Sequence, residues 1–178
     1  KGVRIGVLIC EDTWEAMPAL KAKELGAQLL VAPNASPYRD DKLKAREQMF
    51  TQRYADTGLP MVYCNLVGGQ DELVFDGRSM LLDGEGHLSA PGPLCEEALL
   101  LAEYRPQSRS FTTTGWKAAP GNAAEEIYTV LTTGLRDYVR KNGFSDVVFG
   151  LSGGIDSALT LALAVDALGP GHVHTVMM

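Results

Sequence analysis

The feature that most constrains the fold is the alternation of short apolar runs with segments of helical spacing. Residues 3–10 and 28–33 are almost continuously apolar, which is typical of buried strands. Between them, Pro18 suits the first turn of a helix, and Gly26 suits the position just after a helix end. A strand, a helix and a strand in this order predict an α/β unit.

The alternation of helix and strand continues to residue 67, after which the pattern favours short strands. Residues 42–56 predict a helix, and residues 61–67 predict a further strand. The helix has an apolar stripe that should face the core, formed by Leu43, Met49, Phe50 and Tyr54. Residues 68–104 contain short apolar runs separated by glycine-containing turns, which favour β-hairpins.

Residues 106–122 are rich in Ser, Thr, Gly and Pro and show no sustained period, so they predict a linker. We therefore expect two domains, over residues 1–105 and 123–178. The second begins with a predicted helix over residues 123–141, followed by a short strand and a glycine-rich loop. Residues 158–168 are apolar nearly all round, which predicts a helix buried on most sides.

Charge and composition argue against several classes of protein. The formal net charge is −6, which argues against bulk binding of nucleic acid or of anionic membranes. No apolar run approaches the roughly 18 residues of a membrane span, and no secretory leader is visible. The cysteines Cys10, Cys64 and Cys95 are odd in number and widely spaced, which disfavours a disulfide scaffold or a CxxC zinc site. We expect a reduced, cytoplasmic protein.

Both ends of the sequence fall in strand-like segments. One apolar, strand-like run, residues 3–10, begins two residues after the start of the sequence. Another, VHTVMM, occupies its last residues, 173–178. Apolar strands need flanking partners to be buried. We therefore expect the chain to be an internal piece of a longer protein.

The strongest chemical signal is the SGGIDS loop, residues 152–157, between a predicted strand and a predicted helix. Gly153 and Gly154 let backbone N–H groups approach a phosphate, and the helix N-terminus adds its positive dipole end. The hydroxyls of Ser152 and Ser157 can donate hydrogen bonds, and Asp156 can hold Mg²⁺. The GK[ST] ending of a Walker A loop is missing, which argues against a γ-phosphate-cleaving NTPase.

The second signal is Cys10, at the end of the first predicted strand. The carboxyl ends of strands are where α/β folds keep their sites, and a deprotonated thiol there can attack an amide carbonyl. A backbone N–H at a strand end can also stabilise the developing oxyanion. The alternative is that Cys10 is a small buried hydrophobe, which is the usual fate of a free cysteine.

Several motifs together resemble one enzyme family. The SGGIDS loop resembles the pyrophosphate-binding loop of the ATP pyrophosphatase superfamily, and GVLICEDTW, residues 6–14, resembles the nucleophile motif of nitrilase-type carbon–nitrogen hydrolases. PNASPYRDDK, residues 33–42, and VGGQDELVFDG, residues 67–77, follow at spacings similar to those of the glutaminase domain of glutamine-dependent NAD⁺ synthetases. The resemblance covers nearly the whole chain.

The resemblance implies a fold and a set of site residues. The fold would be a partial nitrilase-like α-β-β-α sandwich followed by the start of a Rossmann-like parallel α/β domain that binds adenine nucleotide. Cys10 matches the nucleophile that forms a thioester with glutamine, and Ser36 and Lys42 match glutamine-binding positions, although Lys42 could also be a solvated lysine at a helix start. Glu11 can orient the substrate or the catalytic lysine, or serve only as a turn carboxylate. Asp156 matches the Mg²⁺ residue. The matched ATP-binding residues are Gly150, Leu151, Ser152, Gly153, Gly154, Ile155, Asp156 and Ser157.

The resemblance also implies an activity, a ligase reaction. Ammonia from glutamine would convert deamido-NAD⁺ to NAD⁺ in an ATP-dependent reaction through an adenylated intermediate, with release of AMP and pyrophosphate. Glutamine, deamido-NAD⁺ and ATP would be the substrates, Mg²⁺ the cofactor, and a homo-oligomer the expected assembly, with no nucleic acid or membrane partner.

One departure from the family pattern bears on activity. In nitrilase-type enzymes a catalytic Glu and Lys precede the cysteine, and only nine residues precede Cys10. We therefore expect this chain alone to lack full activity. Two alternatives stay open: another SGGxDS ligase with a nitrilase-like amidase, and a truncated, non-catalytic assembly module.

Overall fold

The computed structural model describes residues 2–114 and 122–178. These residues form two compact units. The first unit contains residues 2–66 and 75–114, and the second contains residues 67–74 and 122–178.

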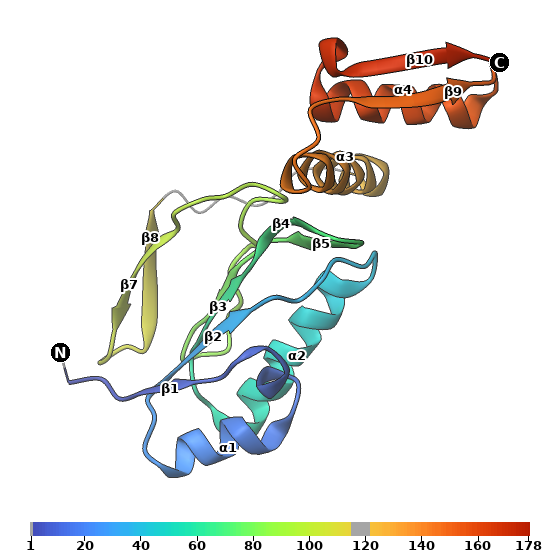
Figure 1. Cartoon of the computed structure of the whole chain (residues 1–178). Helices are drawn as coiled ribbons and strands as arrows, with labels where there is room; N and C mark the ends of the chain where they lie inside the picture. Colours follow the sequence, from blue (N-terminus) through green and yellow to red (C-terminus); the bar gives the residue numbers. More distant parts are fainter. Residues whose placement is uncertain (1, 115–121) are drawn as a thin grey trace. The chain divides into compact units, whose positions relative to one another are not determined.

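A four-stranded mixed sheet organises the first unit (Figure 1). The strands lie in the order β1(Ile5–Val7), β2(Leu29–Asn34), β3(Met61–Asn65) and β6(Met80–Leu82). The first three strands are parallel, and β6 is antiparallel to β3. The connections are α1(Ala16–Glu24) after β1 and α2(Lys42–Thr57) after β2, so the α/β alternation predicted from sequence is confirmed.

The core of the first unit lies between this sheet and the two helices. Met49 and Phe50 of the predicted stripe are buried, and the Phe50 ring meets Tyr63 of β3 edge-on at 5.3 Å between centroids. Leu43 and Tyr54 are partly buried against the same cluster. Gly58 ends α2 in a left-handed conformation, with φ of 62°, as expected for a helix C-terminus.

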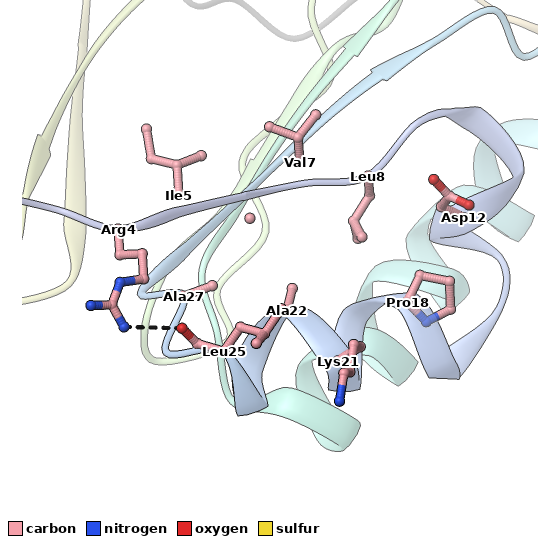
Figure 2. A pocket seen from close by; sticks show the side chains of 11 residues that line it. Arg4, Ile5, Val7, Leu8, Asp12, Pro18, Lys21, Ala22, Leu25 and Ala27 are labelled. Carbon is pink, nitrogen blue, oxygen red and sulfur yellow. Dashed lines mark hydrogen bonds between the residues drawn. The ribbon is translucent and has the colours of Figure 1, made fainter.

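The prediction that residues 3–10 form one buried strand is wrong in extent and in burial. Strand β1 covers only Ile5–Val7, and the side chains of Ile5 and Val7 are 53% and 62% exposed. Figure 2 shows Ile5 and Val7 pointing away from α1, whereas Leu8 points toward it. The reason is that β1 is an edge strand of this sheet, and alternate side chains of a strand face opposite sides.

The first unit also contains an antiparallel hairpin, which joins β7(Leu101–Arg105) to β8(Ser110–Thr114). Strand β8 falls inside the predicted linker, so the expectation of irregular structure is wrong for residues 110–114. Its sequence, SFTTT, is rich in residues that favour strands, and Phe111 packs on Tyr104 across the hairpin at 5.2 Å. Residues 115–121 of the predicted linker lie outside the described residues.

The second unit contains two parallel strands, two helices and a hairpin. Helix α3(Ala123–Lys141) has its predicted bounds, and the Asn122 side chain caps it by accepting the Glu125 N–H at 3.0 Å. It is followed by β9(Val147–Leu151), α4(Ile155–Leu168) and β10(Val173–Met177), with β9 and β10 parallel. The hairpin joins β4(Val67–Gln70) to β5(Leu73–Asp76), whose last two residues belong to the first unit.

Helix α4 is more exposed than its composition predicts. Only Ala164 and Ala167 are buried, whereas Ile155 and Leu159 are 81% and 52% exposed. Among the described residues of this unit, α4 packs on α3 and on the β9–β10 pair, and its other faces remain open. No helix in the described part of the chain is both long and apolar enough to cross a membrane.

Candidate functional site

The first candidate site forms where β1 and β2 end. Cys10 begins the short 3-10 helix η1(Cys10–Thr13) with φ of 49°, a conformation unusual for a residue other than glycine. Two hydrogen bonds fix this turn: Asp12 Oδ2 accepts the Ile9 N–H at 2.9 Å, and Thr13 Oγ1 donates to the Cys10 carbonyl at 2.7 Å. Cys10 is a free thiol and is partly exposed. The turn therefore presents the thiol at the edge of the sheet instead of burying it in the core.

Ser36 lies in the loop that follows β2, the parallel neighbour of β1. Its backbone is held by Asn65, which accepts the Ser36 N–H through Oδ1 at 2.9 Å and donates to the Ser36 carbonyl through Nδ2 at 3.2 Å. Ser36 Oγ and the Tyr63 hydroxyl are both buried, and neither meets hydrogen-bond geometry with the described residues, although interaction with Ser36 lowers the pKa of Tyr63. Ser36 Oγ therefore has Tyr63 as a neighbouring hydroxyl and can also bond to a ligand.

A buried ion pair beneath this loop was missed from the sequence. Arg46 of α2 binds the Asp76 carboxylate with two hydrogen bonds, of 3.0 and 2.8 Å, and donates to the Ser36 carbonyl at 2.9 Å. The two side chains are 0% and 1% exposed. A signal was present, because Arg46 stands three residues after Leu43 and four before Phe50, in the middle of the predicted apolar stripe. A charge at such a position indicates a buried partner.

Lys42 is the first residue of α2 and lies beside Trp14, the residue that follows η1. Its ammonium group sits 4.1 Å from the centre of the Trp14 ring. Burial lowers the pKa of Lys42, and the positive charges of Arg39 and Arg46 lower it further, while the Glu11 carboxylate acts in the opposite direction.

Tyr63 is a further buried group near the thiol. Burial raises its pKa, the charge of Arg46 opposes this rise, and Cys10 is among the smaller contributions that add to it. Cys10 and Glu11 lie in η1, after β1, Ser36 lies in the loop after β2, and Lys42 is the first residue of α2; β1 and β2 are parallel neighbours.

The second candidate site lies in the second unit, where β9 passes into α4. Gly150 and Leu151 end the strand, Ser152–Gly154 form the loop, and Ile155–Ser157 make the first helical turn. Ser157 Oγ donates to the Gly154 carbonyl at 2.9 Å and lies 3.2 Å from Ser152 Oγ.

The two loop glycines differ in their backbone. Gly153 adopts φ of 80°, whereas Gly154 is an extended N-cap residue at φ of −82°. A Cβ added at Gly153 would meet nothing within 4 Å, so the left-handed conformation and not crowding is the reason for glycine there. The loop and the turn are largely exposed, with free helix N–H groups that suit an anion.

Asp156 is the only metal residue predicted from the sequence, and it occupies the exposed first turn of α4. Among residues 2–114 and 122–178, no three His, Cys, Asp or Glu side chains form a group that could hold a metal ion. A lone carboxylate fits Mg²⁺, because this ion binds through one or two carboxylates together with substrate phosphates and water.

A separate cavity of about 350 Å³ lies between β1 and α1 and contains none of the predicted site residues. Figure 2 shows Arg4 at one end, where its guanidinium donates to the Leu25 carbonyl at 3.0 Å. The lining is mainly apolar, and it lacks the convergent polar groups that distinguish the first candidate site.

Two protein-family models match the chain in succession. The carbon–nitrogen hydrolase model matches residues 1–114, and the NAD synthase model matches residues 127–178. The first candidate site lies in the first matched region, and the SGGIDS loop lies in the second.

Curated relatives and solved structures match almost the whole chain. The glutamine-dependent NAD(+) synthetase of Rhodobacter capsulatus is 44% identical over 182 residues, covering 99% of this chain, and that of Xanthomonas campestris pv. campestris is 44% identical over 179 residues, covering 100%. The structure of glutamine-dependent NAD⁺ synthetase from Acinetobacter baumannii in complex with ADP matches with a TM-score of 0.89 at 40% identity, covering 99% of this chain and 34% of that one. The chain spans about a third of the length of these relatives, 32% for both of the curated ones.

Proposed function

Because the chain belongs to the carbon–nitrogen hydrolase family, we propose that it carries the glutamine-hydrolysing site of a ligase that makes NAD⁺ from deamido-NAD⁺. The observation that supports this most is the succession, in one chain, of a carbon–nitrogen hydrolase match and an NAD synthase match. The relatives that share this succession over the whole chain are named glutamine-dependent NAD(+) synthetases.

In this proposal Cys10 is the nucleophile. Its sulfur attacks the side-chain carbonyl carbon of glutamine, the C–N bond breaks, and ammonia leaves with a proton from the site. Water then hydrolyses the thioester, which releases glutamate and restores the thiol. The left-handed backbone at Cys10 and its two hydrogen-bonded neighbours, Asp12 and Thr13, support this role because they hold the thiol at the sheet edge.

Ser36, Lys42 and Glu11 bind the glutamine that Cys10 attacks. The Lys42 ammonium suits the α-carboxylate of an amino acid, and the buried Ser36 Oγ suits its α-amino group. Glu11, next to Cys10 in the chain, orients the substrate.

The Gly150–Ser157 segment binds ATP in the second half of the reaction. The carboxylate of deamido-NAD⁺ attacks the α-phosphorus of ATP, pyrophosphate leaves, ammonia attacks the acyl-adenylate, and AMP leaves. The backbone N–H groups of the loop and of the first turn of α4 bind the phosphates, with Ser152 and Ser157 as hydroxyl donors. Asp156 would hold Mg²⁺, which neutralises phosphate charge when bound.

The proposal applies to the complete protein that contains this chain. We also propose that domains over residues 1–105 and 123–178 are joined within residues 106–122, of which residues 110–114 form strand β8 of the first unit, and that the protein is cytoplasmic and homo-oligomeric.

The decisive experiment replaces Cys10 by Ala in the complete protein. NAD⁺ formation is followed from deamido-NAD⁺ and Mg-ATP, once with glutamine and once with ammonium as nitrogen donor. We expect the glutamine-dependent rate to fall by at least about 10³-fold and the ammonium-dependent rate to stay within about twofold of wild type.

Cys64→Ala is the matched control, because Cys64 is an exposed free cysteine in β3. It should leave both rates unchanged. Retention of glutamine use by Cys10→Ala would refute the assignment of the nucleophile. A wild-type protein that forms no NAD⁺ from either donor would point to another ligase or to a non-catalytic module.

A further inference from the structure

The hairpin of residues 67–74 connects the two units of the chain. Its residues pack with α3 in the second unit, although the residues on either side of it, up to Leu66 and from Phe75, belong to the first unit. Figure 1 shows β4 beside α3. The hairpin lies in the region matched by the carbon–nitrogen hydrolase model, whereas residues 127–141 of α3 lie in the region matched by the NAD synthase model.

Two charged residues of α3 bind the backbone of one hairpin residue, Gly69, on both of its peptide groups. Asp137 Oδ2 accepts the Gly69 N–H at 2.8 Å, and Lys141 Nζ donates to the Gly69 carbonyl at 2.6 Å. The two side chains stand one helical turn apart and bind the donor and the acceptor of the same residue. Charge-assisted hydrogen bonds of this kind are about twice as strong as neutral ones.

Gly69 in the hairpin and Gly134 in α3 permit the close approach of these two segments. A Cβ at Gly69 would come within 3.1 Å of Asp137 Cβ and 3.2 Å of the Gly134 Cα, and a Cβ at Gly134 would meet Val74 Cγ2 at 2.8 Å. The 3.2 Å contact with the Gly134 backbone could be relieved only by a small backbone shift, and the 2.8 Å contact only by movement of the Val74 side chain. The hairpin and the helix are therefore fitted to each other at the backbone.

Residues that hold the first candidate site lie close to the hairpin on both sides of it along the chain: Asn65 ends β3, and Asp76 ends β5. Asn65, four residues before Gly69, fixes Ser36 through its amide, and Asp76, the last residue of β5, binds Arg46. Asn65 Nδ2 also lies 3.3 Å from Asp76 Oδ1, so the two ends are joined. The Leu66 N–H donates to the Asn34 carbonyl at 2.9 Å, which ties the same end to β2.

We infer that Asp137 and Lys141 are positioning residues for the glutamine site, acting through the hairpin of residues 67–74. They fix Gly69, the short strand β4 carries that constraint to Asn65, and Asn65 sets the position of the Ser36 loop. Close-packed segments transmit small displacements instead of absorbing them, so loosening Gly69 displaces Ser36. The inference rests on the proposed function, because the affected quantity is the binding of glutamine.

The test compares nitrogen donors in the complete protein. In Asp137→Leu, which removes the acceptor for the Gly69 N–H, KM for glutamine should rise by about fivefold or more. The kcat and KM values measured with ammonium should remain within about twofold of wild type. Asp137→Asn keeps an oxygen that can accept the Gly69 N–H and should restore most of the affinity for glutamine.

Lys141 has a matched control on the same helix turn. Arg140 is exposed, carries the same charge and makes no side-chain contact with the hairpin among the interactions described. Lys141→Ala should raise KM for glutamine, and Arg140→Ala should leave it unchanged. Thermal unfolding of each variant, followed by circular dichroism, establishes that the compared proteins are folded at the assay temperature.

The outcomes separate this inference from the proposed function. An unchanged KM for glutamine in Asp137→Leu and in Lys141→Ala overturns the inference, and so does an equal loss with glutamine and with ammonium. If the wild-type protein forms no NAD⁺ from either donor, the proposed function fails. Release of glutamate from glutamine then still measures the effect of both variants on the site at Cys10.

Discussion

The two candidate sites are built in opposite ways. At the first, side chains from three separate segments, Arg46, Asn65 and Asp76, converge under the Ser36 loop, and the pair Arg46 and Asp76 is buried. At the second, consecutive residues of one loop and one helical turn supply every predicted group, and most of them are exposed. The first site therefore depends on the packing of its whole unit, whereas the second depends mainly on local backbone conformation.

This difference predicts that the largest effect on stability comes from breaking the buried pair. Asp76→Ala leaves the Arg46 charge buried without its main partner, which costs about 3–5 kcal/mol in the free energy of unfolding. Urea unfolding of the purified protein, followed by circular dichroism, measures this loss. Glutamine use should be lost together with stability, because Arg46 and Asp76 also hold Ser36 and Asn65.

Two further variants sharpen this prediction. The double variant Arg46→Leu with Asp76→Leu removes both charges and should recover much of the stability that Asp76→Ala loses, although not the affinity for glutamine. Arg39→Ala breaks an exposed ion pair with Asp41 and should have no measurable effect on unfolding. A double variant as unstable as Asp76→Ala would show that shape, and not unpaired charge, decides the loss.

The opposite behaviour is expected at the second site. Gly153→Ala forces a side chain into a left-handed conformation, which costs about 1–2 kcal/mol, whereas Gly154→Ala has an allowed backbone and an ordinary 3.6 Å contact with Ser152 Oγ. Both added methyl groups crowd the place where phosphate would approach the loop. Both variants should therefore bind ATP at least about tenfold more weakly in isothermal titration calorimetry, and only Gly153→Ala should lower the melting temperature.

The same contrast explains what could be predicted from the sequence. The SGGIDS loop and the bounds of α3 were predictable because local spacing, an Asn cap and consecutive residues determine them. The pairing of Arg46 with Asp76 was not, because the two residues are 30 positions apart and periodicity does not identify partners. The burial of Ile5 and of Leu159 was also wrongly predicted, since an apolar composition does not say which faces of a strand or helix are covered.

Lys42 offers a pH test confined to the first site. Its pKa is lowered from 10.5 by burial and by the charges of Arg39 and Arg46, so it loses its proton at a lower pH than a free lysine does. KM for glutamine should rise as the pH increases through this lowered pKa, because a neutral amine no longer attracts the α-carboxylate. In the window between that pKa and 10.5 the folded state binds fewer protons than the unfolded state, so the free energy of unfolding rises with pH.

Lys42→Arg is the control for this pH dependence. Arginine stays charged throughout the accessible range, so the part of the alkaline rise in KM that belongs to Lys42 should disappear. Any rise that remains belongs to the α-amino group of glutamine or to other residues. An identical pH profile in the two proteins would contradict the role of Lys42 in binding the carboxylate. Measurements with ammonium as donor should be insensitive to the substitution.

The smallest effect expected is at the turn that presents Cys10. Thr13→Val keeps the shape of the buried side chain but removes the hydrogen bond from Thr13 Oγ1 to the Cys10 carbonyl, which costs about 1 kcal/mol. If that bond helps to hold the unusual backbone of Cys10 in place, kcat for glutamine should fall about fivefold while KM changes little. Thr13→Ser keeps the hydroxyl and should retain kcat even where the lost methyl group lowers stability. If kcat instead falls in whichever variant is less stable, whether or not it keeps the hydroxyl, then Thr13 only fills the core. The position of the thiol would in that case depend on Asp12 and on strand β1 alone.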